Sequence, residues 1–232
     1  MSCVLVLLPS PLLPAAVWRP VAQRLAGAGW PVVELADAQP PRTAADVLTG
    51  FLRAVPPDRD AILIPHSNAG LYVPCVAAER RIRGYVFVDA ALPPPTGSVR
   101  MAPDRFYDFL AGLAGQDGLL PPWTQWWQDD DLDGLFPSTE VRTQVERGQQ
   151  RIPLSYFAGS LPVPPGWDER PGAYLSFGQT YQAERMAATA RGWPTTVLDG
   201  RHLHQLVDPE RVATEIQALI QALPAQAGTA PP

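Results

Sequence analysis

The sequence contains no lysine, because all 18 of its Lys and Arg positions are arginine. This absence excludes a Schiff base between a lysine and pyridoxal phosphate or a sugar aldehyde. It also excludes a Walker-type phosphate loop, which needs its lysine, and a serine–lysine dyad. The net charge is −5 and the arginines form no cluster, so we expect no nucleic-acid partner.

Cysteine is almost as scarce. Cys3 and Cys75 stand far apart in apolar contexts, which predicts buried free thiols in a reducing cytoplasm rather than a disulfide framework. No apolar run approaches the length of a membrane helix, so we expect no membrane partner. Residues 1–16 look like a signal peptide only superficially, because they lack a basic segment and prolines interrupt them. We therefore expect a cytoplasmic protein.

Short apolar runs alternate with helical patterns along most of the chain. Strands are predicted at residues 4–8, 30–35, 61–64, 85–88, 173–177 and 195–198, with helices between them. This alternation predicts an α/β fold with a doubly wound, mostly parallel six-stranded sheet flanked by helices. Ligand sites in such sheets lie at the carboxyl ends of the strands, so the residues that follow strands are the candidate site residues.

A segment rich in proline and tryptophan interrupts the alternation after the fourth strand. We predict that residues 1–95 and 171–223 form the core and that residues 96–170 form a mainly helical cap, or lid. Residues 224–232 are small, polar and rich in proline, which predicts a disordered tail. The length suits one such domain, either as a monomer or as a homodimer.

An acidic stretch at residues 129–140 has the carboxylate spacing of a calcium-binding loop. Pro137 occupies one of the ligand positions, and the sequence contains no second loop of this pattern to pair with it. We interpret it as a solvated acidic turn followed by a helix that Ser138 caps. We predict neither a metal site nor a cofactor.

The most informative segment is Ala61-Ile-Leu-Ile-Pro-His-Ser-Asn-Ala-Gly70. It places Ser67 between a buried strand and a helix, with small residues that permit a tight turn. Asn68 N–H, at the start of that helix, is a candidate donor to an oxyanion. The alternative is that Ser67 only caps the helix. We expect His66 to be a packed, hydrogen-bonded residue rather than a base.

A serine nucleophile needs a base, and the chain has three histidines. Two of them, His202 and His204, lie in Asp199-Gly-Arg-His-Leu-His-Gln-Leu-Val-Asp-Pro209, a loop between the last predicted strand and the last helix. Either is a candidate base, and the alternative is a loop histidine whose hydrogen bonds go to the backbone.

The serine turn and this loop resemble those of the α/β-hydrolase family. The turn is usually G-x-S-x-G in that family, and Pro65 and Ala69 replace its glycines here. The resemblance implies that Ser67 is the nucleophile and that His202, seven residues before Pro209, is the base. It also implies a pocket-lining role for His204.

The family usually places the triad acid after the penultimate strand, where this chain reads Phe177-Gly-Gln-Thr-Tyr181 without a carboxylate. Some members place the acid after the strand that follows the serine turn, and Asp89 stands there. The resemblance therefore implies that Asp89 orients His202. Two alternatives stay open, namely Asp89 as a loop cap and Gln179 or solvent as the group that orients His202. Tyr181 is a further candidate contact to the substrate.

The loop after the first strand is unusual for the family, because Pro11 at the donor position has no N–H. Leu12 N–H or Ser10 is the candidate replacement. The predicted cap carries a tryptophan cluster that either lines an apolar pocket or anchors the cap, at Trp123, Trp126 and Trp127.

These features predict a serine hydrolase that acts by acyl transfer on a small apolar ester, thioester or lactone. One alternative is a non-hydrolytic biosynthetic enzyme that catalyses cyclisation, elimination or C–C cleavage on the same scaffold. The other is a catalytically inactive protein that binds a small molecule. All three name a small molecule as the partner.

Overall fold

A single parallel sheet organises the chain, and the computed structural model describes residues 3–36 and 40–224. Its strands are β1 (Val4–Leu8), β2 (Val32–Glu34), β3 (Ala61–Ser67), β4 (Ile82–Ala90), β7 (Gly172–Phe177) and β8 (Thr195–Leu198). They lie in the order β2-β1-β3-β4-β7-β8, and every neighbouring pair is parallel. The predicted fold class is confirmed.

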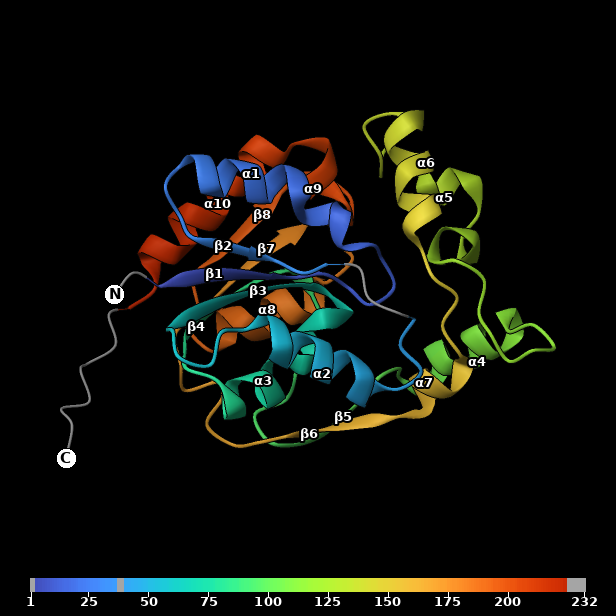
Figure 1. The fold of residues 1–232 in the computed structure, drawn as a ribbon, viewed down its shortest axis with the longest axis horizontal. Coiled ribbons are helices and arrows are strands. Elements are labelled where there is room, and N and C mark those ends of the chain that lie inside the picture. Colours follow the sequence, from blue (N-terminus) through green and yellow to red (C-terminus); the bar gives the residue numbers. More distant parts are fainter. Residues whose placement is uncertain (1–2, 37–39, 225–232) are drawn as a thin grey trace.

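Helices cover both faces of this sheet (Figure 1). One face carries α1 (Arg19–Gly27), α9 (His204–Val207) and α10 (Pro209–Ala222), and the other carries α2 (Ala44–Ala54), α3 (Val73–Glu79) and α8 (Gln182–Ala190). Short 3-10 helices at Ala15–Trp18 and Asn68–Tyr72 lead into α1 and α3. Local chemistry fixes the starts of several helices. Thr43 and Asp46 form a capping box at α2, and Asp208 caps α10 just before Pro209.

The core lies along the central strands, and every residue of β1, β3 and β7 is buried. Burial on both faces explains why these strands appear in the sequence as unalternated apolar runs. The edge strand β2 is only partly buried and shorter than predicted. Two buried polar residues, Ser67 and Asp89, stand at or near the carboxyl ends of β3 and β4.

The chain between β4 and β7 contains the helices α4 (Asp104–Leu113), α5 (Asp129–Leu132), α6 (Thr139–Gly148) and α7 (Leu154–Ala158). A further 3-10 helix spans Trp123–Trp126, and an antiparallel ribbon joins β5 (Gly97–Arg100) to β6 (Ser160–Val163). In Figure 1, α4, α5 and α6 lie beside the sheet rather than on either of its faces. The ribbon was not predicted, because β5 is mostly exposed and shows no apolar alternation.

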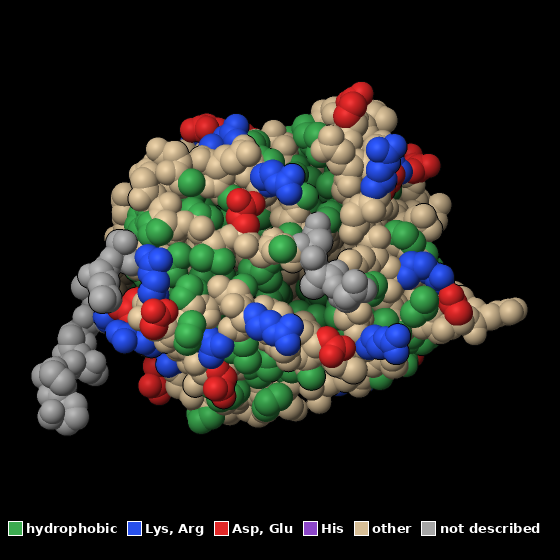
Figure 2. Space-filling view, viewed as in Figure 1, with side chains coloured by type: hydrophobic (Ala, Val, Ile, Leu, Met, Phe, Trp, Pro, Cys, Tyr) green, Lys and Arg blue, Asp and Glu red, His purple; other side chains and the backbone are tan. Residues whose placement is uncertain are grey.

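Apart from Pro224, the predicted tail at residues 224–232 lies outside the described residues. No helix among the described residues is both long and apolar enough to cross a membrane. Within the same residues, no group of three or more His, Cys, Asp or Glu side chains is placed to hold a metal ion. On the face drawn in Figure 2, arginine and carboxylate side chains are interspersed across the surface.

Candidate active site

Ser67 ends β3 in a backbone conformation that side chains rarely adopt, with φ at 58° and ψ at −131°. Its carbonyl accepts a hydrogen bond from Ala91 N–H at 3.0 Å, which holds the turn against the end of β4. A Cβ at Gly70 would lie 2.0 Å from the Ala91 carbonyl oxygen. Position 70 therefore requires glycine, because the backbone there packs directly against the Ala91 carbonyl. This is a strained strand-to-helix turn of the kind that presents a nucleophile.

Asp89 also has a positive φ, 41°, and its side chain is completely buried. One carboxylate oxygen accepts the N–H of Phe177 at 3.0 Å, and the other lies 2.6 Å from His202 Nδ1. This pairing places the hydrogen of a neutral His202 on Nδ1 and leaves Nε2 as an acceptor. The structure thus joins His202 to Asp89, whereas Gln179 is exposed to solvent.

Ser67 Oγ lies 3.4 Å from the hydroxyl of Tyr181. No hydrogen bond joins Ser67 to His202 among the described residues, although both side chains line one cavity. Hydrogen bonds of this kind are often long without substrate and tighten when it binds. Ser67, Asp89 and His202 therefore lie at the same end of the sheet, and among these three only Asp89 and His202 are joined by a hydrogen bond.

The cavity that Ser67 and His202 share has a volume of about 490 Å³. The ring of Trp123 is tilted against that of His202, with 6.0 Å between the centroids, so the segment between β4 and β7, here called the inserted segment, contacts the candidate site. Most of the other lining residues are apolar or aromatic. The apolar and aromatic ones are Leu12, Phe106, Trp127, Leu135 and Tyr181, and the polar ones are Asn68, Asp131, Thr180 and Arg201.

Sequence reasoning missed five of these lining residues. Thr180 and Arg201 adjoin predicted site residues in the chain, and that adjacency was the available signal. Phe106, Asp131 and Leu135 carried no signal that pointed to this cavity, because their positions depend on how the inserted segment packs.

Four predicted substrate-binding residues do not line this cavity. Trp126 packs against the rings of Phe106 and Phe157, and its indole N–H donates to the Pro121 carbonyl at 2.7 Å. Because all three partners also lie between β4 and β7, Trp126 packs within that segment. Gln179 lies on an exposed turn, and no hydrogen bond joins its side chain to another described residue.

The other two are His204 and Ser10. His204 begins α9, and its ring meets the edge of Phe177 rather than the cavity. Ser10 is buried, and its Oγ accepts the N–H of Leu12 at 3.3 Å. Leu12 N–H, one of the two candidate replacements for the donor that Pro11 lacks, is thus already engaged within its own loop.

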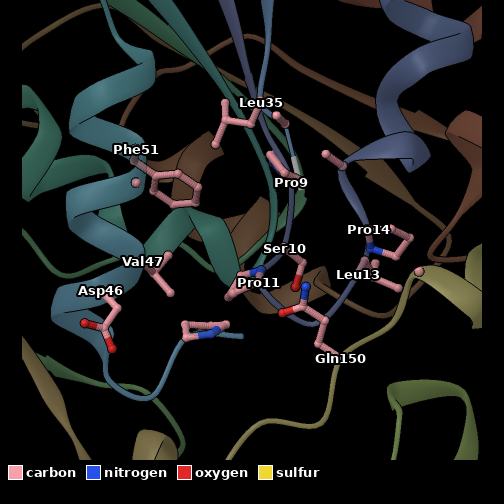
Figure 3. Close-up of a pocket in the computed structure, with 15 residues that line it drawn as sticks. Pro9, Ser10, Pro11, Leu13, Pro14, Leu35, Asp46, Val47, Phe51 and Gln150 are labelled. Atoms are coloured by element: carbon pink, nitrogen blue, oxygen red, sulfur yellow. The ribbon is translucent and has the colours of Figure 1, made fainter. Parts of the chain in front are cut away.

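Ser10 instead faces a second, smaller cavity of about 130 Å³ on the other side of its loop (Figure 3). Phe51 and Val47 of α2 form its opposite wall. Ser67, Asp89 and His202 do not line it, so the larger cavity is the one next to the candidate nucleophile.

His66 packs directly behind His202. The two rings are stacked with 4.6 Å between their centroids, and His66 Nε2 lies 2.9 Å from the carbonyl oxygen of His202. Burial and the neighbouring His202 lower the pKa of His66 well below its ordinary value. A neutral His66 therefore donates its Nε2–H to the His202 backbone, which is the packed, hydrogen-bonded arrangement predicted for it.

Asn68, the residue after the serine, is fixed by two buried tyrosines. Tyr156 donates to Asn68 Oδ1 at 2.8 Å, and Tyr72 lies 2.6 Å from the Tyr156 hydroxyl. Burial raises the pKa of both tyrosines, so both keep their hydrogens. This chain of hydroxyls holds the Asn68 amide in one orientation beside Ser67.

Comparison with known proteins identifies the fold. No protein-family model matches the sequence, and the comparison with curated proteins returned no match. Solved structures are similar over almost the whole chain. An extracellular α/β-hydrolase from a Paenibacillus species has 17% identity and a TM-score of 0.71, covering 94% of this chain and 99% of its own.

Two further structures extend the comparison. Polyneuridine aldehyde esterase has 17% identity and a TM-score of 0.72, covering 96% of this chain and 99% of its own. Tomato methylketone synthase I, in complex with β-ketoheptanoate, has 11% identity and a TM-score of 0.67 over the same shares. At these identities the likeness concerns the fold, and this protein has the α/β-hydrolase fold.

Proposed function

We propose that the protein is a serine hydrolase that acts by acyl transfer, with Ser67 as nucleophile, His202 as base and Asp89 as acid. The observation that carries the proposal is the 2.6 Å contact between Asp89 and His202 Nδ1 beside a cavity that Ser67 shares. A buried carboxylate at this distance orients the imidazole and stabilises its cation.

The reaction follows from these positions. Ser67 Oγ attacks the acyl carbon while its proton passes to His202 Nε2, and Asn68 N–H donates to the developing oxyanion. His202 then gives that proton to the leaving group as the bond between the acyl carbon and the leaving group breaks. Water attacks the acyl-enzyme in a second step, and His202 accepts its proton and returns it to Ser67.

The cavity favours a small apolar ester, thioester or lactone as substrate. Its volume of about 490 Å³ and its wall of Phe106, Trp123, Trp127 and Leu135 suit a small apolar acyl group. Two of the similar structures are named a hydrolase and an esterase, which supports the same reaction class.

A second candidate is a non-hydrolytic reaction on the same scaffold, such as cyclisation, elimination or C–C cleavage. The observation that favours it is that Ser67 Oγ contacts Tyr181 rather than His202, while Leu12 N–H is occupied by Ser10. One similar structure is named a methylketone synthase, so the fold is not confined to proteins named as hydrolases.

Labelling with a fluorophosphonate probe tests the proposal. We expect the probe to attach to Ser67 of the folded protein, the exposed Ser155→Ala variant to be labelled equally, and Ser67→Ala to remain unlabelled. Absence of labelling, with no turnover of short-chain esters, would contradict serine hydrolysis. If activity on a natural substrate survived Ser67→Ala but not His202→Ala, the non-hydrolytic candidate would replace it.

A further inference from the structure

Tyr181 brings a phenol hydroxyl to the side chain of Ser67. The two oxygens lie 3.4 Å apart, and this is the one hydrogen bond that the Ser67 side chain makes with any described residue. Tyr181 also lines the same cavity as Ser67 and His202. Its ring is tilted against the His202 ring at 5.6 Å between centroids. The hydroxyl therefore faces the space in which a reacting acyl group would sit.

The backbone holds Tyr181 in place at the start of α8. Its carbonyl accepts the N–H of Arg185 at 3.0 Å, and Gln182 N–H donates to the Gln179 carbonyl at 3.2 Å. Burial raises the pKa of the phenol, so it keeps its hydrogen at neutral pH. Tyr181 is thus a prepositioned, uncharged hydrogen-bond donor.

The order of the strands decides which part of a substrate this donor meets. Leu12 follows β1, on one side of the strand that carries Ser67, whereas Tyr181 and His202 follow β7 and β8 on the other. The base must return its proton to the leaving group, so the leaving atom lies on the His202 side of the acyl carbon. Tyr181 is on that side too.

We propose that Tyr181 is a catalytic residue whose hydroxyl donates a hydrogen bond to the leaving-group oxygen of an ester, a role that rests on the serine hydrolase function proposed above. When the bond from the acyl carbon to that oxygen breaks, its electron pair stays on the oxygen. Tyr181 stabilises the growing negative charge, and His202 Nε2–H supplies the proton. The phenol keeps its own hydrogen throughout.

The same hydroxyl serves the second half of the reaction. The hydrolytic water attacks from the position that the leaving group has vacated, because both steps pass through the same base. Tyr181 then hydrogen-bonds the water oxygen while His202 removes one proton from it. The new bond joins the water oxygen to the acyl carbon, and Ser67 leaves with the proton from His202.

The test compares kcat/KM of Tyr181→Phe and the native protein on butyrate esters that differ only in the leaving group. We expect a loss of less than about threefold on p-nitrophenyl butyrate, whose leaving group needs little help, and of about 10²-fold on ethyl butyrate. The control is Tyr107→Phe, which removes a phenol on α4 that does not line the cavity. It should leave both rates unchanged.

Labelling of Tyr181→Phe with the fluorophosphonate provides the second measurement. Fluoride departs without a proton, so the variant should react at close to the native rate, which also shows that its site is folded. An equal loss on all esters would assign Tyr181 to the oxyanion, and no loss would leave it without a role. Either result overturns the proposal. If the native protein neither reacts with the probe nor cleaves any ester, the proposed function itself fails.

Discussion

Replacement of Asp89 by asparagine tests the acid of the candidate triad while preserving its shape. Asp89 accepts one hydrogen bond from Phe177 N–H and contacts His202 Nδ1 with its other oxygen. The asparagine side chain has only one oxygen. If that oxygen accepts the hydrogen bond from Phe177 N–H, the amide NH₂ faces His202. Nδ1 must then accept, and the ring hydrogen moves to Nε2, where it prevents His202 from taking the Ser67 proton.

The expected loss follows from this change of tautomer. We expect kcat for p-nitrophenyl butyrate to fall by about 10⁴-fold, the size of effect seen when a triad aspartate becomes asparagine. That corresponds to about 5 kcal/mol of transition-state stabilisation. The free energy of unfolding should change by no more than about 1 kcal/mol, because the buried site keeps its volume and its bond to Phe177.

The assay needs a matched loss of charge elsewhere. Glu184 is a half-buried carboxylate in the first turn of α8, close in the chain to the turn after β7. Glu184→Gln should retain activity within about threefold of the native rate, since its carboxylate makes no hydrogen bond to His202. If Asp89→Asn stayed within tenfold of native activity while folded, the assignment of Asp89 as the acid would be refuted.

Three further predictions concern stability, each measured by urea unfolding. Gly70→Ala should lower the free energy of unfolding by about 3 kcal/mol, because its Cβ would meet the Ala91 carbonyl oxygen. The control Gly50→Ala, in the middle of α2 with open space around it, should raise that free energy by up to about 1 kcal/mol. Equal effects of the two substitutions would contradict the close approach at Gly70. Thr43→Ala should lose about 1 kcal/mol through its capping box, and an unchanged value would show that the cap is not stabilising. Burial lowers the pKa of His66 in the folded protein, whereas the unfolded chain gains that proton below about pH 6.5, so this histidine lowers stability on acidification, by at most about 2 kcal/mol between pH 7.5 and pH 5. His66→Gln should flatten that dependence, and an unaltered slope would place the titration elsewhere.

The sheet was predictable from the sequence because its central strands are buried on both faces. Burial of this kind produces apolar runs such as Val4–Leu8, which need no knowledge of their neighbours to be recognised. The serine turn was predictable for a similar local reason, since small residues must follow Ser67. The sequence pattern did not show that the glycine requirement falls at Gly70, because the atom that excludes a Cβ belongs to Ala91, which directly follows the neighbouring strand β4.

The lining of the cavity depended on contacts between distant parts of the chain. Three tryptophans within five residues carried the same aromatic signal, yet Trp123 and Trp127 line the cavity and Trp126 packs against Phe157. Which ring lines the cavity depends on contacts with residues distant in the chain, such as that between Trp126 and Phe157. Composition alone could therefore place aromatics near the site without assigning them.

The partner of Asp89 also depends on contacts between distant parts of the chain, which the strand order determines. Asp89 as a loop cap and Asp89 as a partner of His202 look identical in the sequence, and the adjacency of β4, β7 and β8 is what places His202 within 2.6 Å. Under the proposed assignment of Asp89, on β4, as the acid, the turn after β7 carries Tyr181 in place of a carboxylate. Side-chain donors then gather on the His202 side of Ser67, while the β1 side has Pro11 and a Leu12 N–H bonded to Ser10. Under the proposed reaction, hydrogen-bond donors are therefore better supplied for the leaving-group oxygen than for the carbonyl oxygen. This difference favours esters whose leaving group needs a hydrogen bond over esters whose carbonyl oxygen needs one.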